Sequence, residues 1–216
     1  MTFKAVIWDF GGVITSSPFD AFNRYEAEHG LPVNFIRGVN ARNPDSNAWA
    51  RLERSEISAA DFDTAFAAEA AALGHAVPGR IVLGLLAGDV RPAMVAALDA
   101  CRAAGYKLGC ITNNAKVGEG PGMTDDPAKA AAVAAIMTRF DAVIESAKTG
   151  LRKPDPRIYQ MMCETLAVAP ADCVYLDDLG INCKPAAALG MTAIKVDNQQ
   201  QALTALGAVL GMDFPN

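Results

Sequence analysis

Three groups of polar residues each follow a short apolar run in this 216-residue sequence. Several carboxylates held close together repel one another unless a proton or a cation offsets their charge. Mg²⁺ is a hard cation that binds to carboxylates, waters and phosphate oxygens. If the three runs are neighbouring strands, the groups predict a site for magnesium and phosphate. The groups are Asp9, Thr112 with Asn113 and Asn114, and Asp177 with Asp178.

Lys153 and Thr112 complete a set of residues suited to phosphoryl transfer. Lys153 precedes Pro154 in a loop stiffened by prolines and would supply positive charge to phosphate oxygens, while Thr112 would donate a hydrogen bond. Asp9 would attack phosphorus as a carboxylate nucleophile, and water would then hydrolyse the aspartyl-phosphate. Taken singly, each group could equally be a helix cap, a turn residue or a solvated charge. The convergence of all of them favours a functional site.

The elements that must position these residues follow from the apolar pattern. A strand buried on both faces is a continuous apolar run, and ligands of open α/β sheets bind beyond the carboxyl ends of the strands. Helical segments alternate with the later strands, which predicts a doubly wound parallel sheet of the α/β class. The predicted strands are Ala5–Trp8, Tyr106–Ile111, Ala142–Glu145, Cys173–Leu176 and Thr192–Val196; the predicted helices are Pro92–Ala104, Pro127–Thr138, Arg157–Leu166, Cys183–Leu189 and one from Gln199.

Roughly ninety residues separate the first two strands, far more than one crossover helix needs. Helical patterns fill this gap, at Phe19–His29, Asn47–Arg54 and from Ser58 to Leu73. We therefore predict a helical cap domain at residues 15–88 and an α/β core at residues 1–14 and 89–216. The glycines between Lys116 and Asp126 do not fit a dinucleotide-binding loop, so we expect a mobile surface loop there.

Composition excludes several classes of function. The net charge is −5 and no block of Lys and Arg occurs, which argues against nucleic-acid partners. No apolar run approaches the roughly 18 residues of a membrane span. Five cysteines without a CxxC pair, and no leader-like start, predict a reducing cytoplasm. His29 and His75 are the only histidines, too few for a zinc cluster and poorly placed for a Ser/His/Asp triad.

Four motifs, in order along the chain, resemble those of the haloacid dehalogenase-like hydrolases. The motifs are Asp9-Phe10-Gly11-Gly12-Val13, Thr112-Asn113, Lys153 and Asp177-Asp178. The run from Val174 to Ala186 looks especially like the N-terminal phosphatase domain of soluble epoxide hydrolases. The resemblance covers nearly the whole chain. It implies the Rossmann-like fold of that family, a helical cap and a magnesium-dependent phosphatase activity.

The resemblance also implies a role for each motif residue. Asp9 corresponds to the nucleophile and a metal ligand, and Asp178 to a direct magnesium ligand. Asp177 corresponds to a ligand or to a group that reaches the metal through water. The backbone carbonyl of Gly11 would complete the metal site, while Thr112, Asn113 and Lys153 would hold the phosphoryl group.

Gly11 departs from the family pattern. The phosphatases that the chain resembles usually carry a second Asp at this position, whose carboxyl group protonates the leaving group. Losing such an acid typically lowers a rate by about 10²- to 10⁴-fold. We therefore expect a slow phosphatase, a preference for good leaving groups, or an acid supplied by the cap, where Asp20, Glu26 and Glu53 are candidates.

Two other functions stay open. A 2-haloacid dehalogenase would not need the missing acid, and Tyr159 suits that branch of the family, but Asp177-Asp178 differs from the Ser-x-Asn pattern of those metal-independent enzymes. Alternatively, the chain could bind a phosphorylated ligand without turning it over. The expected partner is a small phosphorylated molecule; its identity and the oligomeric state do not follow from the sequence.

Overall fold

A single parallel sheet of five strands forms the centre of the protein. The structure is a computed structural model that describes residues 3–115 and 126–214. The strand order is β3-β2-β1-β4-β5, with neighbours all parallel. The prediction of a doubly wound α/β sheet is confirmed. The strands are β1 (Ala5–Trp8), β2 (Lys107–Thr112), β3 (Ala142–Glu145), β4 (Cys173–Asp177) and β5 (Thr192–Lys195).

Strand β1 lies in the middle because the chain winds away from it in both directions. All four of its residues are buried, as its continuous apolar run predicts. Trp8 at its carboxyl end is level with Cys110 of β2 and with Leu176 of β4. The residues that follow these three strands therefore share one edge of the sheet, at the point where the strand order reverses.

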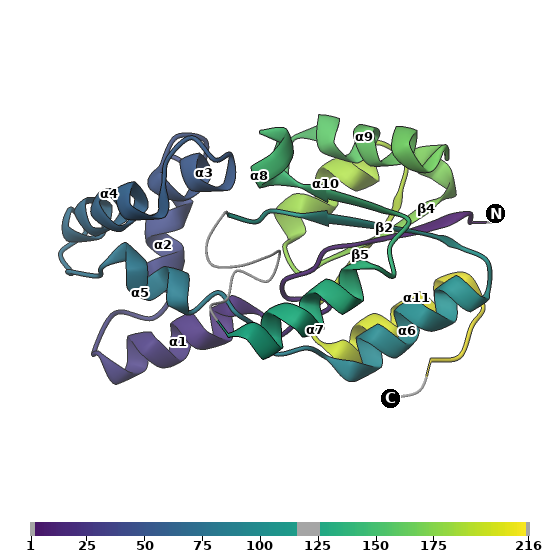
Figure 1. The fold of residues 1–216 in the computed structure, drawn as a ribbon, viewed down its shortest axis with the longest axis horizontal. Helices are drawn as coiled ribbons and strands as arrows, with labels where there is room; N and C mark the ends of the chain where they lie inside the picture. The colour runs from purple at the N-terminus through teal and green to yellow at the C-terminus, as the bar shows by residue number, and fades with distance from the viewer. Residues whose placement is uncertain (1–2, 116–125, 215–216) are drawn as a thin grey trace.

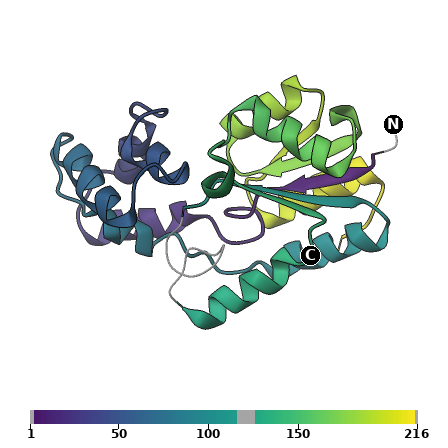
Figure 2. The same ribbon diagram turned by 45° about the horizontal axis from the view of Figure 1, so that its top comes forward.

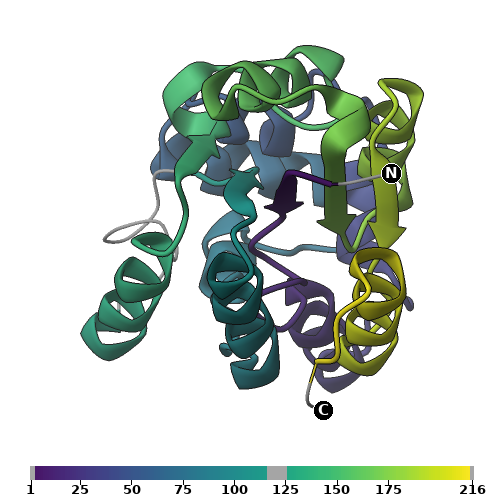
Figure 3. The ribbon, with the colours of Figure 1, turned by 90° about the vertical axis from the view of Figure 1, so that its right-hand side faces the viewer.

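Helices cover both faces of the sheet, as Figure 3 shows. Successive side chains of a strand point to opposite faces of the sheet, so Val6 and Trp8 pack into one apolar cluster while Ala5 and Ile7 pack into the other. Helices α6 (Pro92–Ala103), α7 (Pro127–Met137) and α11 (Gln199–Leu210) lie on the first face; α8 (Ser146–Thr149), α9 (Pro156–Leu166) and α10 (Gly180–Ala188) lie on the second, with the short 3₁₀ turn η1 (Pro170–Asp172) before β4.

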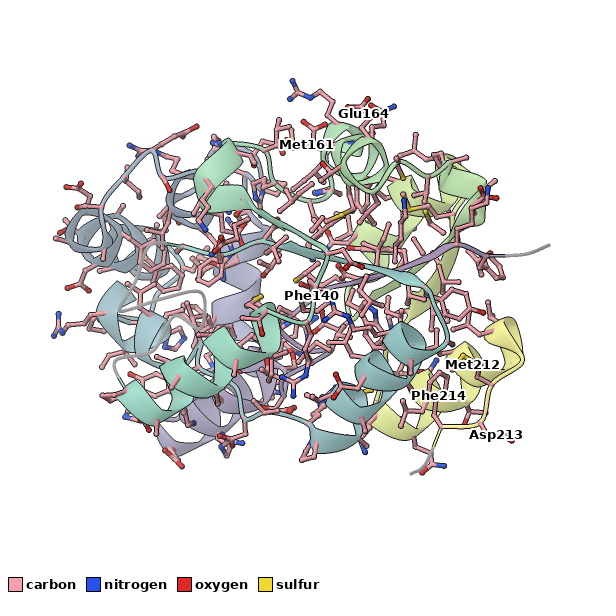
Figure 4. All side chains as sticks on the ribbon, turned by 45° about the vertical axis from the view of Figure 1, so that its right-hand side comes forward. Phe140, Met161, Glu164, Met212, Asp213 and Phe214 are labelled. Carbon is pink, nitrogen blue, oxygen red and sulfur yellow. The ribbon has the colours of Figure 1, made fainter. Side chains whose placement is uncertain are left out.

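Side chains fill the two layers between sheet and helices (Figure 4). Phe140, after α7, belongs to the cluster on the first face, and the partly buried Phe214 packs against the same cluster. The segment from Met212 to Phe214 runs back along α11, where Phe214 lies beside Gly207. Glu164 on α9 points away from the sheet into solvent.

A second group of helices, between β1 and α6, lies beyond the carboxyl ends of the strands (Figures 1 and 2). We call α1 to α5 the helical insertion. It has its own apolar cluster, which includes Phe22, Ile36, Phe62 and Phe66. The helices are α1 (Pro18–Glu28), α2 (Phe35–Ala41), α3 (Ala48–Glu53), α4 (Ala59–Ala71) and α5 (Gly79–Gly84).

The two chain segments that join the insertion to the core run antiparallel to each other. Thr15 and Val90 form an isolated bridge, and the Ser16 amide donates to the Asp89 carbonyl at 2.8 Å. A Cβ at Gly88 would lie only 2.5 Å from the Ser16 carbonyl oxygen, so this crossing requires glycine. The predicted domain boundaries, at residues 15–88, stay a prediction.

Some elements differ from those predicted. Helix α10 begins at Gly180 rather than Cys183, because side chains at the end of β4 fix its first turn, and α2, α5 and α8 were not predicted. Strands β2 and β4 each extend one residue further, through Thr112 and Asp177. The mobile loop predicted between Lys116 and Asp126 falls almost wholly on residues 116–125, which lie outside the described residues. Within the described chain, no helix combines the length and the apolar character that a bilayer crossing requires.

Candidate active site

Asp9 stands directly after β1, at the edge where the strand ends meet. Its amide donates to the Leu176 carbonyl at 2.8 Å, which continues the pairing of β1 with β4. Its Oδ1 accepts from the Phe10 amide at 2.6 Å, and its Oδ2 lies 2.8 Å from Lys153 Nζ. Asp9 is 7% exposed. A carboxylate is thus held at the strand tip with one edge facing a cation.

Lys153 is a buried cation at the centre of the site. Its Nζ contacts the Ile111 carbonyl at 3.0 Å, Asp177 Oδ2 at 2.8 Å and Asp9 Oδ2 at 2.8 Å. An ammonium group has three N–H donors, so these contacts use all of them. Burial alone would lower the pKa of Lys153, but the charges of Asp177 and Asp9 outweigh it and hold the pKa above its ordinary value. Lys153 is therefore charged.

Asp177 is enclosed by donors on both oxygens. Its Oδ1 accepts from the Leu179 amide at 2.8 Å and its Oδ2 from the Tyr175 hydroxyl at 2.5 Å, in addition to the Lys153 contact. Asn182 Nδ2 lies 3.0 and 3.1 Å from the two oxygens. Leu179 and Asn182 belong to the start of α10, so Asp177 joins this helix to Lys153.

Asp178 faces the opposite way, toward the loop after β1. Its Oδ2 accepts from Ser17 Oγ at 3.2 Å, and Ser17 is also the N-cap of α1. Burial, reinforced by the charge of Asp177, raises the pKa of Asp178 to about 6. A Cβ at Gly12 would lie 2.1 Å from the same Oδ2, and Gly12 has φ +79°. Only glycine lets the backbone pass this close to Asp178.

Gly11 differs from its neighbour in having space around it. A Cβ added there meets no atom within 4 Å. The loop is nonetheless held in place, because Arg91 Nη1 donates to the Gly12 carbonyl at 2.7 Å. A side chain at position 11 would thus enter open space beside the nucleophile rather than collide with it.

Three carboxylates, those of Asp9, Asp177 and Asp178, place oxygens within 4.8 Å of one another. Among the described residues, Lys153 is the one ammonium group that contacts this cluster, through Asp9 and Asp177, so two of the three negative charges have no cationic partner there. Burial raises the pKa of Asp9 well above its ordinary value, with Lys153 opposing this and Asp177 and Asp178 adding to it. Such a cluster of oxygen donors suits a hard divalent cation. Because Asp177 is already enclosed, Asp9 and Asp178 are the carboxylates best able to hold it.

The motif at the end of β2 divides into two parts. Thr112 is buried, and among the residues described here no hydrogen bond engages its hydroxyl. Asn113 is joined to Lys153: its Nδ2 donates to the Lys153 carbonyl at 3.0 Å and its Oδ1 accepts from the Lys153 amide at 2.8 Å. Asn114 instead donates to Glu145 at 2.7 Å, which fixes β2 against β3.

The three cap carboxylates proposed as substitute acids have other contacts or face solvent. Glu26 is buried and accepts from the Asn34 amide at 2.7 Å and the Ile36 amide at 2.9 Å, so it caps α2. Glu53 pairs with Arg152 at 2.6 Å. Asp20 is exposed on the first turn of α1. The geometry favours none of the three as a proton donor.

Several residues of the site were not predicted. Tyr175 looks like a core residue of an apolar strand, and Ser17, Arg152 and Asn182 look like ordinary polar residues of loops and helix ends. Only the Asp177-x₄-Asn182 spacing, which places both side chains on one side of a helix start, could have indicated one of them.

Comparison with known proteins places this chain in a family. A model of the haloacid dehalogenase-like hydrolases matches residues 3–190. The chain is 33% identical to mouse acyl-CoA dehydrogenase family member 10 and 29% identical to mouse bifunctional epoxide hydrolase 2, over 99% and 100% of its length. It spans only 20% and 40% of those two proteins. Phosphatase MT3486 of Mycobacterium tuberculosis is 31% identical, over 97% of this chain and 98% of that protein.

Solved structures agree on the fold. One is a haloacid dehalogenase-family enzyme of Bacteroides thetaiotaomicron in complex with magnesium and inorganic phosphate, with a TM-score of 0.56 and 17% identity over 89% of this chain and 93% of that one. Another is the L-2-haloacid dehalogenase of Xanthobacter autotrophicus, with a TM-score of 0.61 and 22% identity over 99% and 85%. This chain belongs to the haloacid dehalogenase-like hydrolases.

Proposed function

We propose that this protein is a magnesium-dependent phosphatase of small phosphorylated molecules that acts through an aspartyl-phosphate on Asp9. One observation carries the proposal: three carboxylates converge and, among the described residues, a single buried ammonium group contacts them, through Asp9 and Asp177, which leaves two negative charges for a divalent cation to offset. The similarity to a mycobacterial phosphatase over almost its whole length supports the phosphatase branch of the family. So does the fold's likeness to an enzyme solved with magnesium and phosphate.

Asp9, Asp178 and the backbone carbonyl of Gly11 would hold the cation. When bound, it supplies positive charge to the oxygens of the phosphoryl group and of Asp9. Burial raises the pKa of both Asp9 and Asp178, with the charge of Asp177 adding to it, and a bound cation would oppose that rise. Asp177, engaged on both oxygens, positions Lys153 instead.

Asp9 would form the new bond to phosphorus while the bond from phosphorus to the leaving oxygen breaks. Lys153 can donate hydrogen bonds both to Asp9 before the reaction and to the phosphoryl group after it. One of its three N–H donors binds Asp9 Oδ2, and the others bind Asp177 and the Ile111 carbonyl. Once Asp9 is an acyl phosphate, it no longer carries a carboxylate charge, so that first N–H can turn to a phosphoryl oxygen. Thr112 and Asn113 would bind the remaining oxygens.

Water would then attack phosphorus, breaking its bond to Asp9 and releasing inorganic phosphate. Position 11 offers no carboxyl group to protonate the leaving group or to activate this water. A Cβ at Gly11 would meet no atom within 4 Å, so no side chain of the described residues occupies the place of the missing carboxyl group. We therefore expect rates about 10²- to 10⁴-fold below those of an enzyme with a positioned acid, and a preference for leaving groups that need no proton.

The test is hydrolysis of p-nitrophenyl phosphate, whose leaving group is good, with Mg²⁺ and with EDTA. Sustained turnover that requires Mg²⁺ supports the proposal. A burst of one product equivalent without a steady state would indicate a phosphate-ligand-binding protein. Unchanged activity in Lys153→Ala would contradict the assignment of Lys153 as a phosphate clamp. A panel of phosphorylated metabolites with Mg²⁺ would then identify the substrate.

A 2-haloacid dehalogenase is the second candidate, favoured by the absence of an acid at Gly11 and by Tyr159. Tyr159 is fully buried, and its hydroxyl donates to the Asn182 carbonyl at 2.8 Å, so it lies beside the network around Asp177. The uncompensated charge of the carboxylate cluster argues against metal-free chemistry. Release of chloride from 2-chloropropionate in EDTA would overturn the phosphatase proposal.

A further inference from the structure

A buried ion pair joins the helical insertion to the core beside the candidate active site. Glu53 is the last residue of α3, and Arg152 immediately precedes Lys153. Arg152 Nε and Nη2 each lie 2.6 Å from Glu53 Oε2, and the two side chains are only 18% and 8% exposed. Arg152 Nη1 also donates to the Pro44 carbonyl at 2.9 Å. One guanidinium group therefore binds two segments of the insertion.

The same carboxylate oxygen approaches the phosphate-binding pair. Asn113 Nδ2 lies 3.5 Å from Glu53 Oε2 and donates to the Lys153 carbonyl at 3.0 Å. The Lys153 amide in turn donates to Asn113 Oδ1 at 2.8 Å. Glu53 thus contacts Asn113 directly and reaches the backbone of Lys153 through its neighbour Arg152. The carboxylate of Glu53 is the point where the insertion meets both residues.

These contacts differ from a neighbouring bond between the insertion and the core. Ser55, two residues after Glu53, donates to the Ala147 carbonyl at 2.9 Å, and this bond does not touch Asn113 or Lys153. A buried charge is retained only with its partner in place, because removal of one member leaves the other uncompensated. The Glu53–Arg152 pair therefore exists only when α3 lies against the loop that carries Lys153.

We propose that Glu53 is a positioning residue which, through Arg152 and Asn113, fixes Asn113 and Lys153 for binding of the phosphoryl group. The proposal rests on the function proposed above for those two residues. Phosphate binding and the contact of α3 with this loop are then coupled, since each favours the same arrangement. Loss of the charge on Glu53 should weaken binding of inorganic phosphate as well as of substrate.

The first experiment compares Glu53→Gln with Ser55→Ala, a matched variant that removes a neighbouring bond of the same interface. We expect Glu53→Gln to raise the KM for p-nitrophenyl phosphate and the inhibition constant of inorganic phosphate about tenfold, with a smaller change in kcat. Ser55→Ala should leave both constants unchanged. If the two variants lower Tm alike and neither changes these constants, Glu53 only joins the two parts of the protein and the proposal is wrong.

A double-mutant cycle tests the route through Arg152. Arg152→Gln combined with Glu53→Gln should weaken phosphate binding no more than the worse single variant, because both remove the same pair. Additive effects would contradict the route. Should Glu53→Gln fail to fold, Arg152→Lys keeps the charge but loses the planar fork and should raise the same constants less. Unchanged constants in Arg152→Lys would then overturn the proposal.

The thermal shift caused by inorganic phosphate with Mg²⁺ separates this proposal from the proposed function. If the wild-type protein shows no turnover but is stabilised by phosphate, the phosphatase proposal fails, and a smaller shift in Glu53→Gln still supports the positioning role. An equal shift in both proteins contradicts it. A folded wild-type protein that phosphate does not stabilise contradicts both proposals.

Discussion

Buried carboxylates occur in two regions of this protein, the carboxyl edge of the sheet and the helical insertion, and their surroundings differ. In the insertion, Glu26 accepts two backbone N–H groups at the start of α2, and Glu53 is paired with Arg152. Each of these charges has donors of its own. At the sheet edge, three carboxylates cluster, and among the described residues one lysine contacts two of them, Asp9 and Asp177. Burial raises the pKa of Asp9 and Asp178, as it also does for Glu53, but in Glu53 the facing guanidinium of Arg152 opposes it directly.

The difference teaches how to separate structural from functional charges in this fold. A carboxylate whose oxygens are matched by donors holds two segments together. A set that remains short of positive charge stores an unfavourable interaction that a ligand can relieve. By this measure Glu26, although it is only 2% exposed, belongs to the scaffold, whereas Asp9 belongs to the site.

The largest expected effect is the difference in activity between variants of Asp9 and of Glu26. Asp9→Asn should abolish Mg²⁺-dependent turnover, because an amide is no nucleophile. It should keep or raise the Tm of the metal-free protein, because burial and the neighbouring carboxylates disfavour the charge of Asp9 and Lys153 still pairs with Asp177. Glu26→Gln should lower the free energy of unfolding by about 1–3 kcal/mol through weaker bonds to α2. Its kcat per folded molecule should be unchanged. Steady-state rates and urea unfolding check both; a Glu26→Gln variant as inactive as Asp9→Asn would remove the distinction.

Within the sheet edge, Gly11 and Gly12 allow a second contrast. Gly11→Asp enters open space and should raise the hydrolysis of alkyl phosphates, such as glycerol phosphate, by about 10²- to 10⁴-fold through a restored acid, with little gain for p-nitrophenyl phosphate. Gly12→Ala should lose activity, because its Cβ would meet Asp178. Gly11→Asn is the control of equal size without a proton. Equal rates in the Asp and Asn variants would show that no acid was missing.

The same division explains what the sequence could and could not predict. Asp9, Thr112, Lys153 and Asp177 were predictable because each follows an apolar strand or lies in a loop, and the carboxyl ends of parallel strands share one edge. Helices α1, α3 and α4 of the insertion were predictable, but α2, α5 and the contacts of the insertion were not. The pairing of Glu53 with Arg152 joins residues 99 positions apart, and no local pattern marks it.

Local propensity also misplaced one helix. Glycine and asparagine at positions 180 and 182 are poor helix formers, and Pro185 favours a first turn, so the sequence predicted a start at Cys183. The structure starts α10 three residues earlier, since Asp177 binds the Leu179 amide and Asn182. A local side-chain contact thus overrides propensity at the residue that positions Lys153.

The adjacent Asp177 and Asp178 should respond differently to loss of charge. Asp178→Asn should weaken Mg²⁺ binding by more than the roughly 10- to 100-fold that loss of an outer-shell partner causes. Asp177→Asn should mainly destabilise the fold, by about 1–3 kcal/mol, because an amide cannot accept at both positions where the Tyr175 hydroxyl, the Leu179 amide and Asn182 donate. Titration of activity with Mg²⁺ and urea unfolding separate the two. Equal loss of metal affinity in both variants would make Asp177 a ligand.

The smallest effect concerns the binding of Mg²⁺ to the resting protein at different pH. Asp178 has a pKa raised from 3.8 to about 6, so the folded protein takes up a proton more readily than the unfolded chain, and this group's contribution to stability declines as pH rises through that interval. Mg²⁺ competes with that proton. At a hundred times its Kd it should stabilise the protein by about 2.7 kcal/mol at pH 7.5, a shift of a few degrees in Tm, and by less at pH 5.

The insertion provides the control for this last experiment. Glu26→Gln should show the same Mg²⁺-induced shift as the wild-type protein at both pH values, because its carboxylate is matched by backbone donors and lies outside the cluster. Asp178→Asn should show almost none. An Mg²⁺-induced Tm shift that is independent of pH, or that persists in Asp178→Asn, would place the cation elsewhere. The excess negative charge at the sheet edge would then have no role in metal binding.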